Sequence, residues 1–117
     1  MRDFRKYEIW QLGMSIVSST YRLLNDLPDS EKFGLRSQVS RCAISVPSNI
    51  AEGCSRESEK DFKRFLEYSL GSCFELETQL LIYQENNFTD QIETEIIVDK
   101  VKQLQKQITV LIKKIKA

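Results

Sequence analysis

SQVSRCAISVPSNIAEG, residues 37–53, decides the fold of this chain. Its apolar residues recur every three or four positions, which is the period of an α-helix: Val39, Cys42, Ala43, Val46 and Ile50. Pro47 interrupts that pattern, where it removes a backbone donor and crowds the preceding turn at a cost of about 3 kcal/mol. The stretch therefore predicts a helix kinked near Pro47, which we favour, or a helix that breaks and restarts near Ser45.

Other amphipathic segments flank this stretch. Helices are predicted over residues 8–26, 31–54, 58–86 and from 90 to near the C-terminus. In the last of these, apolar residues step by 4, 3, 4, 3 and 4, a coiled-coil-like seam: Ile97, Val101, Leu104, Ile108, Leu111 and Ile115. Short loops make consecutive helices antiparallel neighbours. The sequence predicts an all-α, up-down-up-down antiparallel four-helix bundle that forms one domain over residues 1–117.

Helix ends carry their own signals. Ser58, with Asp61 three residues on, predicts an N-cap, and Thr89 or Asp90 predicts the next one. Gly53 is expected to end the second helix in the left-handed conformation, and 86–87 (Asn-Asn) to end the third. Gly71, inside the third helix, costs about 1 kcal/mol relative to alanine, and we expect close packing against the segment near Pro47 to compensate.

Composition excludes several functional classes. The chain has 117 residues, three cysteines and no histidine, and no CxxC occurs. Zinc sites are thus nearly excluded, and three unpaired thiols suit a reducing cytoplasm. The start, MRDFRKYE, lacks an apolar core that a signal peptide needs, and no apolar run approaches the ~20 residues of a membrane span. We expect a cytoplasmic protein with no catalytic, metal or cofactor residues.

The chain resembles a known family at three places. These are YEIWQL (Tyr7–Leu12), the opening stretch over residues 37–53, and FKRFLEYSLGSCFELETQL (Phe62–Leu80). Together they resemble the four-helix-bundle proteins encoded within intervening sequences of bacterial 23S rRNA genes, which are similar to accessory variability proteins of retroelements. The resemblance implies a ring-like homopentamer of bundles. Some relatives are labelled ribosomal proteins, but a net charge of zero is atypical for a protein buried in rRNA.

The zero net charge hides an uneven distribution. Residues 67–99 hold 8 acidic and no basic side chains, and residues 100–117 hold 6 lysines and no acid. In an antiparallel bundle, ten basic and six acidic side chains gather at one end, which gives that end a net charge of +4. The opposite end then has a net charge of −4. The basic end predicts phosphate binding, with these candidate residues: Arg56, Lys60, Lys63, Arg64, Lys113, Lys114 and Lys116. The alternative is a solvated lysine tail. Stacking of nucleobases on aromatic side chains among these bases is not expected.

A second polar set lies beside the apolar stripes of the second and third helices: Arg41, Asn49, Glu52, Glu75, Glu77 and Gln79. A catalytic carboxylate pair is one reading, but Glu75 and Glu77 are two residues apart and point to different helix faces. We favour a buried or interfacial hydrogen-bonded network, in which Arg41 pairs with Glu75 or Glu77 within the chain or across an interface. Cys42 and Cys73 fall at one level and could touch as reduced thiols, either as packing residues or as a redox switch.

These patterns predict a non-enzymatic oligomeric bundle that associates with RNA or DNA through its basic end. The alternative is a protein–protein scaffold ring that binds no nucleic acid. Neither reading requires a small-molecule substrate, a cofactor or a membrane.

Overall fold

The structure is a computed structural model that describes residues 2–27, 30 and 34–117. Its described part is all-α. A short 3₁₀ helix, η1 (Phe4–Lys6), precedes four α-helices: α1 (Glu8–Leu24), α2 (Leu35–Cys54), α3 (Glu59–Glu85) and α4 (Gln91–Lys114). The predicted four helices are therefore confirmed. The predicted start of the second helix, at residues 31–33, lies outside the described residues.

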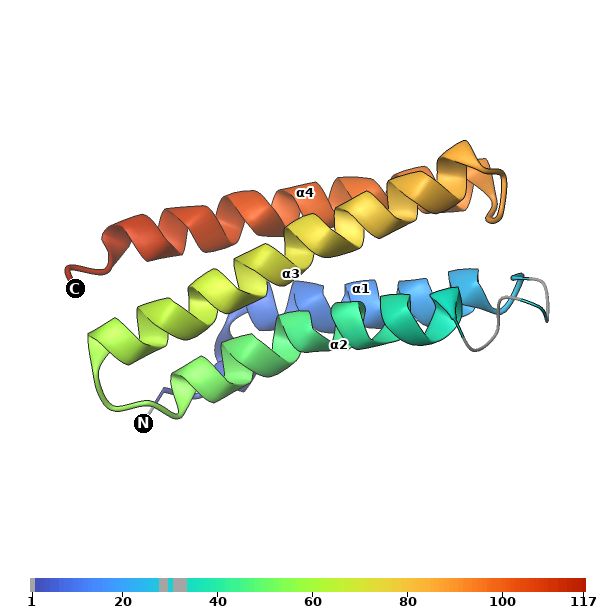
Figure 1. Cartoon of the computed structure of the whole chain (residues 1–117). Coiled ribbons are helices and arrows are strands. Elements are labelled where there is room, and N and C mark those ends of the chain that lie inside the picture. The colour runs from blue at the N-terminus through green and yellow to red at the C-terminus, as the bar shows by residue number, and fades with distance from the viewer. Residues whose placement is uncertain (1, 28–29, 31–33) are drawn as a thin grey trace.

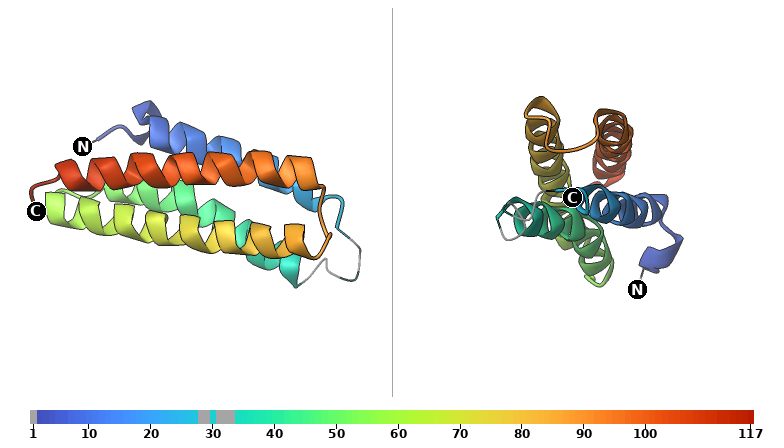
Figure 2. Two further views of the ribbon diagram at one scale, coloured as in Figure 1. Left: turned by 90° about the horizontal axis from the view of Figure 1, so that it is seen from above. Right: turned by 90° about the vertical axis from the view of Figure 1, so that its right-hand side faces the viewer.

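The four helices form an elongated bundle whose extents are 45 × 23 × 20 Å. Consecutive helices run in opposite directions, and α1 packs against both α2 and α4 (Figure 1). The start of η1, the end of α4 and the α2–α3 connection lie at one end of the bundle, while the end of α1, the start of α2 and the α3–α4 connection lie at the other (Figure 2). This layout brings residues from three distant parts of the sequence to the same end.

Side-chain caps fix the starts of α3 and α4. The Ser58 hydroxyl accepts a hydrogen bond from the Asp61 amide at 3.0 Å, and the Asp90 carboxylate accepts one from the Glu93 amide at 2.8 Å. Both predicted caps are confirmed, with Asp90 rather than Thr89 as the second. Asn87, between α3 and α4, adopts φ 59°, a left-handed conformation that asparagine tolerates better than most residues. The sharp turn between these helices therefore depends on Asn87.

The predicted apolar stripes form the core. The five stripe residues of α2 are all buried, as are Ile97, Val101, Leu104 and Ile108 of the α4 seam. Leu111 and Ile115 are partly buried against the same core. A buried polar contact joins two helices inside it, where the Ser69 hydroxyl of α3 donates to the Val46 carbonyl of α2 at 2.8 Å. Apolar burial and this cross-helix bond together set the register of α2 against α3.

Helix α2 continues through Pro47, which excludes the predicted alternative of a break near Ser45. A bend at Pro47 stays a prediction. Pro47 is buried against α1, because a Cβ added at Gly13 would lie 3.3 Å from the Pro47 Cβ. Glycine at position 13 therefore lets α1 approach the proline closely.

Two expectations about glycines were wrong. Gly53 lies inside α2 without a positive φ, and α2 ends at Cys54. Glycine is needed at position 53 for packing, since an added Cβ would lie 2.9 Å from the Phe65 Cβ. Gly71 is exposed, and an added Cβ would meet nothing within 4 Å. Gly71 therefore does not pack against the Pro47 segment; Gly13 does.

Candidate nucleic-acid interface

Contacts between distant segments build the basic end of the bundle. The Arg2 guanidinium donates to the Arg56 carbonyl at 2.9 Å and forms an ion pair with Glu59, which ties the N-terminal segment to the α2–α3 connection. The Lys63 ammonium donates to the Ala117 carbonyl at 3.1 Å, which ties α3 to the C-terminal segment. The structure therefore brings together the residues proposed from the sequence for phosphate binding.

The arginines at this end are already partnered. Arg56 forms an ion pair with Glu52 at 3.6 Å, and Arg64 forms one with Asp61 at 3.1 Å. Both pairs join residues three or four apart in the chain at the solvent-accessible surface, so each contributes little to stability. Each nevertheless places a carboxylate beside the guanidinium, which lowers the local positive charge that a phosphate would meet.

The exposed lysines are the unpaired cations of this end. Four lysines have no carboxylate oxygen within 4.0 Å of their ammonium nitrogen among the residues that the structure describes: Lys60, Lys113, Lys114 and Lys116. Each is exposed to solvent. An ammonium without a carboxylate partner keeps its full charge for an external anion, so these four lysines are the most accessible cations among the seven candidates.

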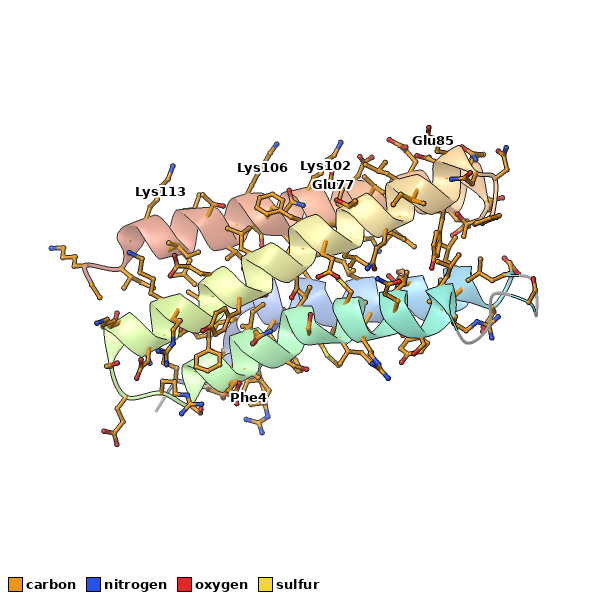
Figure 3. The ribbon with its side chains drawn as sticks, viewed as in Figure 1. Phe4, Glu77, Glu85, Lys102, Lys106 and Lys113 are labelled. Carbon is orange, nitrogen blue, oxygen red and sulfur yellow. The ribbon has the colours of Figure 1, made fainter. Side chains whose placement is uncertain are left out.

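A row of lysines extends the basic surface along α4. Lys102, Lys106 and Lys113 project from the same outward side of α4 (Figure 3). At 1.5 Å per residue, the row spans about 16 Å along the helix axis. Lys102 and Lys106 were missed as candidates because the prediction considered only the helix end. The spacing of four and seven residues, which places all three on one helical face, was the available signal.

Aromatic rings do lie among the bases at this end, contrary to the expectation from the sequence. The Arg2 guanidinium lies 4.1 Å from the centre of the Phe62 ring, and Arg56 lies 4.8 Å from that of Phe65. The sequence already shows this interleaving, because Phe62 lies between Lys60 and Lys63 and Phe65 directly follows Arg64. Because arginines cover these rings, stacking of nucleobases on them requires the arginines to move.

The opposite end carries acidic side chains. Asp26 of the segment after α1 lines one depression with Asp90 and Glu93 at the start of α4, and Arg22 is the one basic residue among its lining. The net charge of −4 predicted for this end includes three charged residues that lie outside the described residues, at positions 29, 31 and 32. The bundle therefore has a basic end and an acidic end, which orients it in an external field.

The polar set of α2 and α3 does not form one network within the chain. Three contacts of this set join residues four apart in the chain: Asn49 donates to the Ser45 carbonyl at 2.8 Å, Glu52 pairs with Arg56, and Gln79 donates to Glu75 at 3.4 Å. The fourth joins α3 to α4, where Gln105 donates to Glu77 at 2.8 Å. Arg41, Glu52 and Glu75 are exposed. A buried network of these six residues is therefore not what fixes the register of α2 and α3.

Arg41 and Glu75 line a shared depression between α2 and α3 of about 550 Å³. In the described part of the chain, Arg41 is within ion-pair distance of neither Glu75 nor Glu77. The predicted pairing within the chain is therefore not formed, and pairing across an interface stays a prediction.

Comparison with known families decides the membership of this chain. The family model described as 23S rRNA-intervening sequence protein matches residues 5–110. The chain belongs to this family. A search of curated proteins finds no match. The match covers all four helices apart from the last residues of α4, and it confirms the resemblance that residues 7–12, 37–53 and 62–80 indicated.

The three cysteines of this family member are buried. Cys42, Cys54 and Cys73 are free thiols. Burial raises the pKa of Cys42 to about 12, with a smaller contribution from Glu75, and burial raises the pKa of Cys73 to about 12, with a smaller contribution from Cys42. The Cys42 thiol donates to the Ser72 carbonyl at 3.3 Å. These thiols are protonated at neutral pH, which suits packing rather than reactivity.

Two further properties of the described residues bear on the chemistry open to this family member. Within residues 2–27, 30 and 34–117, no group of three or more histidine, cysteine, aspartate or glutamate side chains is arranged to hold a metal ion. None of the described helices combines the length and the hydropathy needed to cross a bilayer. The family description names no enzymatic activity.

Proposed function

We propose that this protein is a non-enzymatic, oligomeric bundle that associates with the phosphate backbone of RNA or DNA through its basic end. The observation that carries the proposal is the set of unpaired, exposed lysines at that end, Lys60, Lys113, Lys114 and Lys116, continued along α4 by Lys102 and Lys106. Their charge supports binding to a polyanion without base recognition, because each lysine that contacts a phosphate releases a condensed counterion.

Oligomerisation strengthens the proposal. The protein has a formal net charge of zero, so a single copy is not attracted to nucleic acid over long distances. In a ring of copies with parallel axes, such as the family resemblance implies, every basic end faces the same way. The ring then presents one extended basic face, and the acidic ends point away from the nucleic acid.

Binding of single-stranded RNA at several salt concentrations tests the proposal. In the variant Lys60→Gln, Lys113→Gln, Lys114→Gln, we expect the slope of log Kobs against log salt to lose about 2 units per bound chain, at about 0.7 for each phosphate contact. A control at the opposite end, Arg22→Gln, Asn25→Asp, Ser30→Asp, lowers the net charge by the same amount. Equal loss in both variants, or no binding by the parent at low salt, would refute the proposal.

A scaffold for another protein is the second candidate function. Exposed apolar side chains on α3 support it, because such patches mark interaction sites: Tyr68, Phe74, Leu81 and Ile82. If the protein forms oligomers that bind no nucleic acid at low salt, the scaffold function gains support.

A further inference from the structure

A groove between α1 and α4 opens at the basic end of the bundle, beside the lysines that are proposed to contact phosphate. We call it the α1–α4 groove. Residues 7–9 at the start of α1 line one side of it, and the C-terminal part of α4 lines the other. Its volume is about 460 Å³, within the range of about 300–1,000 Å³ that binding sites for small molecules occupy.

The floor of the α1–α4 groove is apolar. Ile9 is buried, Leu111 is partly buried, and Val110 is 51% exposed. Tyr7 also lines the groove, and its ring packs edge-to-face on Phe62 with 6.2 Å between the ring centres. Because these side chains are held by the core and by Phe62, the groove offers an apolar surface that exists before any ligand binds.

Two lysines flank the exposed part of this floor. Lys106, Val110 and Lys114 follow one another at intervals of four residues, which places Val110 between the two lysines on one side of α4. Neither lysine has a carboxylate oxygen within 4.0 Å of its ammonium nitrogen in the part of the chain that the structure describes. The groove therefore combines an apolar floor with unpaired cations at its rim, as a nucleotide requires.

Glu8 and Gln107 contribute the other polar groups of the groove. Neither side chain forms a hydrogen bond or an ion pair with another described residue. The carboxylate accepts hydrogen bonds, and the amide both donates and accepts them, so both can meet the polar edge of a nucleobase. Because the Glu8 carboxylate repels phosphate, the backbone of a bound strand is expected on the α4 side of the groove, beside the lysines.

The lysine row on α4 leads a nucleic-acid strand to this groove. Lys106 belongs both to the row on the outward side of α4 (Figure 3) and to the lining of the groove. Lys106 and Lys114 lie about 12 Å apart along the helix axis. A stacked strand advances about 3.4 Å per nucleotide, so this separation spans roughly three nucleotides. A strand whose phosphates contact both lysines therefore carries its bases past Val110.

We infer that the α1–α4 groove receives an unstacked base of a single-stranded RNA or DNA whose phosphates contact Lys106 and Lys114. The apolar floor covers one face of the base, a contact that every base can make, so little sequence preference is expected. A base of a duplex reaches the floor only by leaving its stack and its pair. The inference rests on the proposed function and adds a preference for single strands over duplexes, which phosphate contacts alone do not produce.

Fluorescence of a base analogue tests whether a base enters the groove. The probe is a short single-stranded RNA that carries 2-aminopurine at one internal position, and the comparison is the same RNA paired with its complement. At one low salt concentration, we expect the full chain to bind the single strand more tightly than the duplex. The fluorescence of the analogue should change when the single strand binds, because the base leaves its neighbours.

Substitutions at Val110 change the floor of the groove and keep every lysine. Val110→Gln should weaken binding of the single strand about tenfold and leave duplex binding unchanged. Val110→Phe enlarges the apolar surface and should bind the single strand more tightly, a gain that a misfolded chain cannot show. Ile96→Gln is the matched control, because Ile96 is 49% exposed on α4 and lies outside the groove, and it should bind like the parent.

The outcomes separate the groove from the phosphate contacts. Equal affinity for single strand and duplex, or equal binding by Val110→Gln and Ile96→Gln, overturns the inference. If the variant with Lys60, Lys113 and Lys114 replaced still loses salt slope in that case, the phosphate contacts stand without the groove. A chain that binds neither probe refutes the proposed function and the groove together. Binding of an added acidic amphipathic helix in place of RNA, with loss in Val110→Gln, would assign the groove to a protein partner and overturn the inference.

Discussion

Replacing Gly53 by alanine tests whether close packing, rather than helix termination, explains this glycine. The new Cβ would lie 2.9 Å from the Phe65 Cβ and 3.3 Å from the Phe62 Cδ1, closer than ordinary contacts between carbon atoms. Overpacking of this kind costs about 1–3 kcal/mol. Alanine gains up to about 1 kcal/mol of helix propensity, but less near a helix end such as this one. We expect a net loss of about 1–2 kcal/mol in the free energy of unfolding.

Gly71→Ala is the matched control, because the same change at an open position has the opposite expected sign. An added Cβ there meets nothing within 4 Å, so the free energy of unfolding should rise by about 1 kcal/mol. The two variants should therefore differ by about 2–3 kcal/mol.

Urea denaturation followed by circular dichroism measures these free energies, with the slope m checked for constancy across the variants. If Gly53→Ala is as stable as its parent, the phenylalanines move aside at little cost and the packing explanation is refuted. If both variants gain stability equally, the two glycines differ only in helix propensity.

Two further predictions concern the bundle interior. Folding raises the pKa of Cys42 and Cys73 from 9.0 to about 12. Between these pH values the folded chain therefore holds thiol protons that the unfolded chain releases. The free energy of unfolding should fall as pH rises from about 9 towards 12, by up to about 1.4 kcal/mol per pH unit for each thiol. Denaturation at a series of pH values measures this fall, and a chain with Cys42→Ala and Cys73→Ala that shows the same fall would contradict the assignment to these thiols. Ser69→Ala removes the buried hydrogen bond to the Val46 carbonyl and should lower the free energy of unfolding by about 1 kcal/mol. Ser18→Ala, at an exposed position of α1, is its control, and an equal effect of both changes would show that the cross-helix bond contributes nothing.

Local patterns determined most of the helices. Apolar residues three and four apart, with cap signals at Ser58 and at Thr89 or Asp90, were enough to place both ends of α3 and the start of α4 to within about a residue, because helix periodicity and capping depend on neighbours in the chain. The gathering of Arg56, Lys60 and the C-terminal lysines at one end also followed from the sequence. Short connections leave antiparallel packing as the simple solution, and antiparallel packing fixes which segments share an end.

Tertiary structure alone decided what each glycine does. Gly13, Gly53 and Gly71 all lie within helices, yet one faces Pro47, one faces Phe65 and one faces open space. No local pattern separates these cases, since the difference depends on atoms from other helices. The same holds for one ion pair: Arg2 and Glu59 are far apart in the sequence, and only the fold brings the guanidinium to the carboxylate. Helix formation and ion pairs three or four residues apart depend on near neighbours in the chain, so the sequence predicts them. The close approach of helices and the contacts between distant segments depend on distances that only the packed bundle defines.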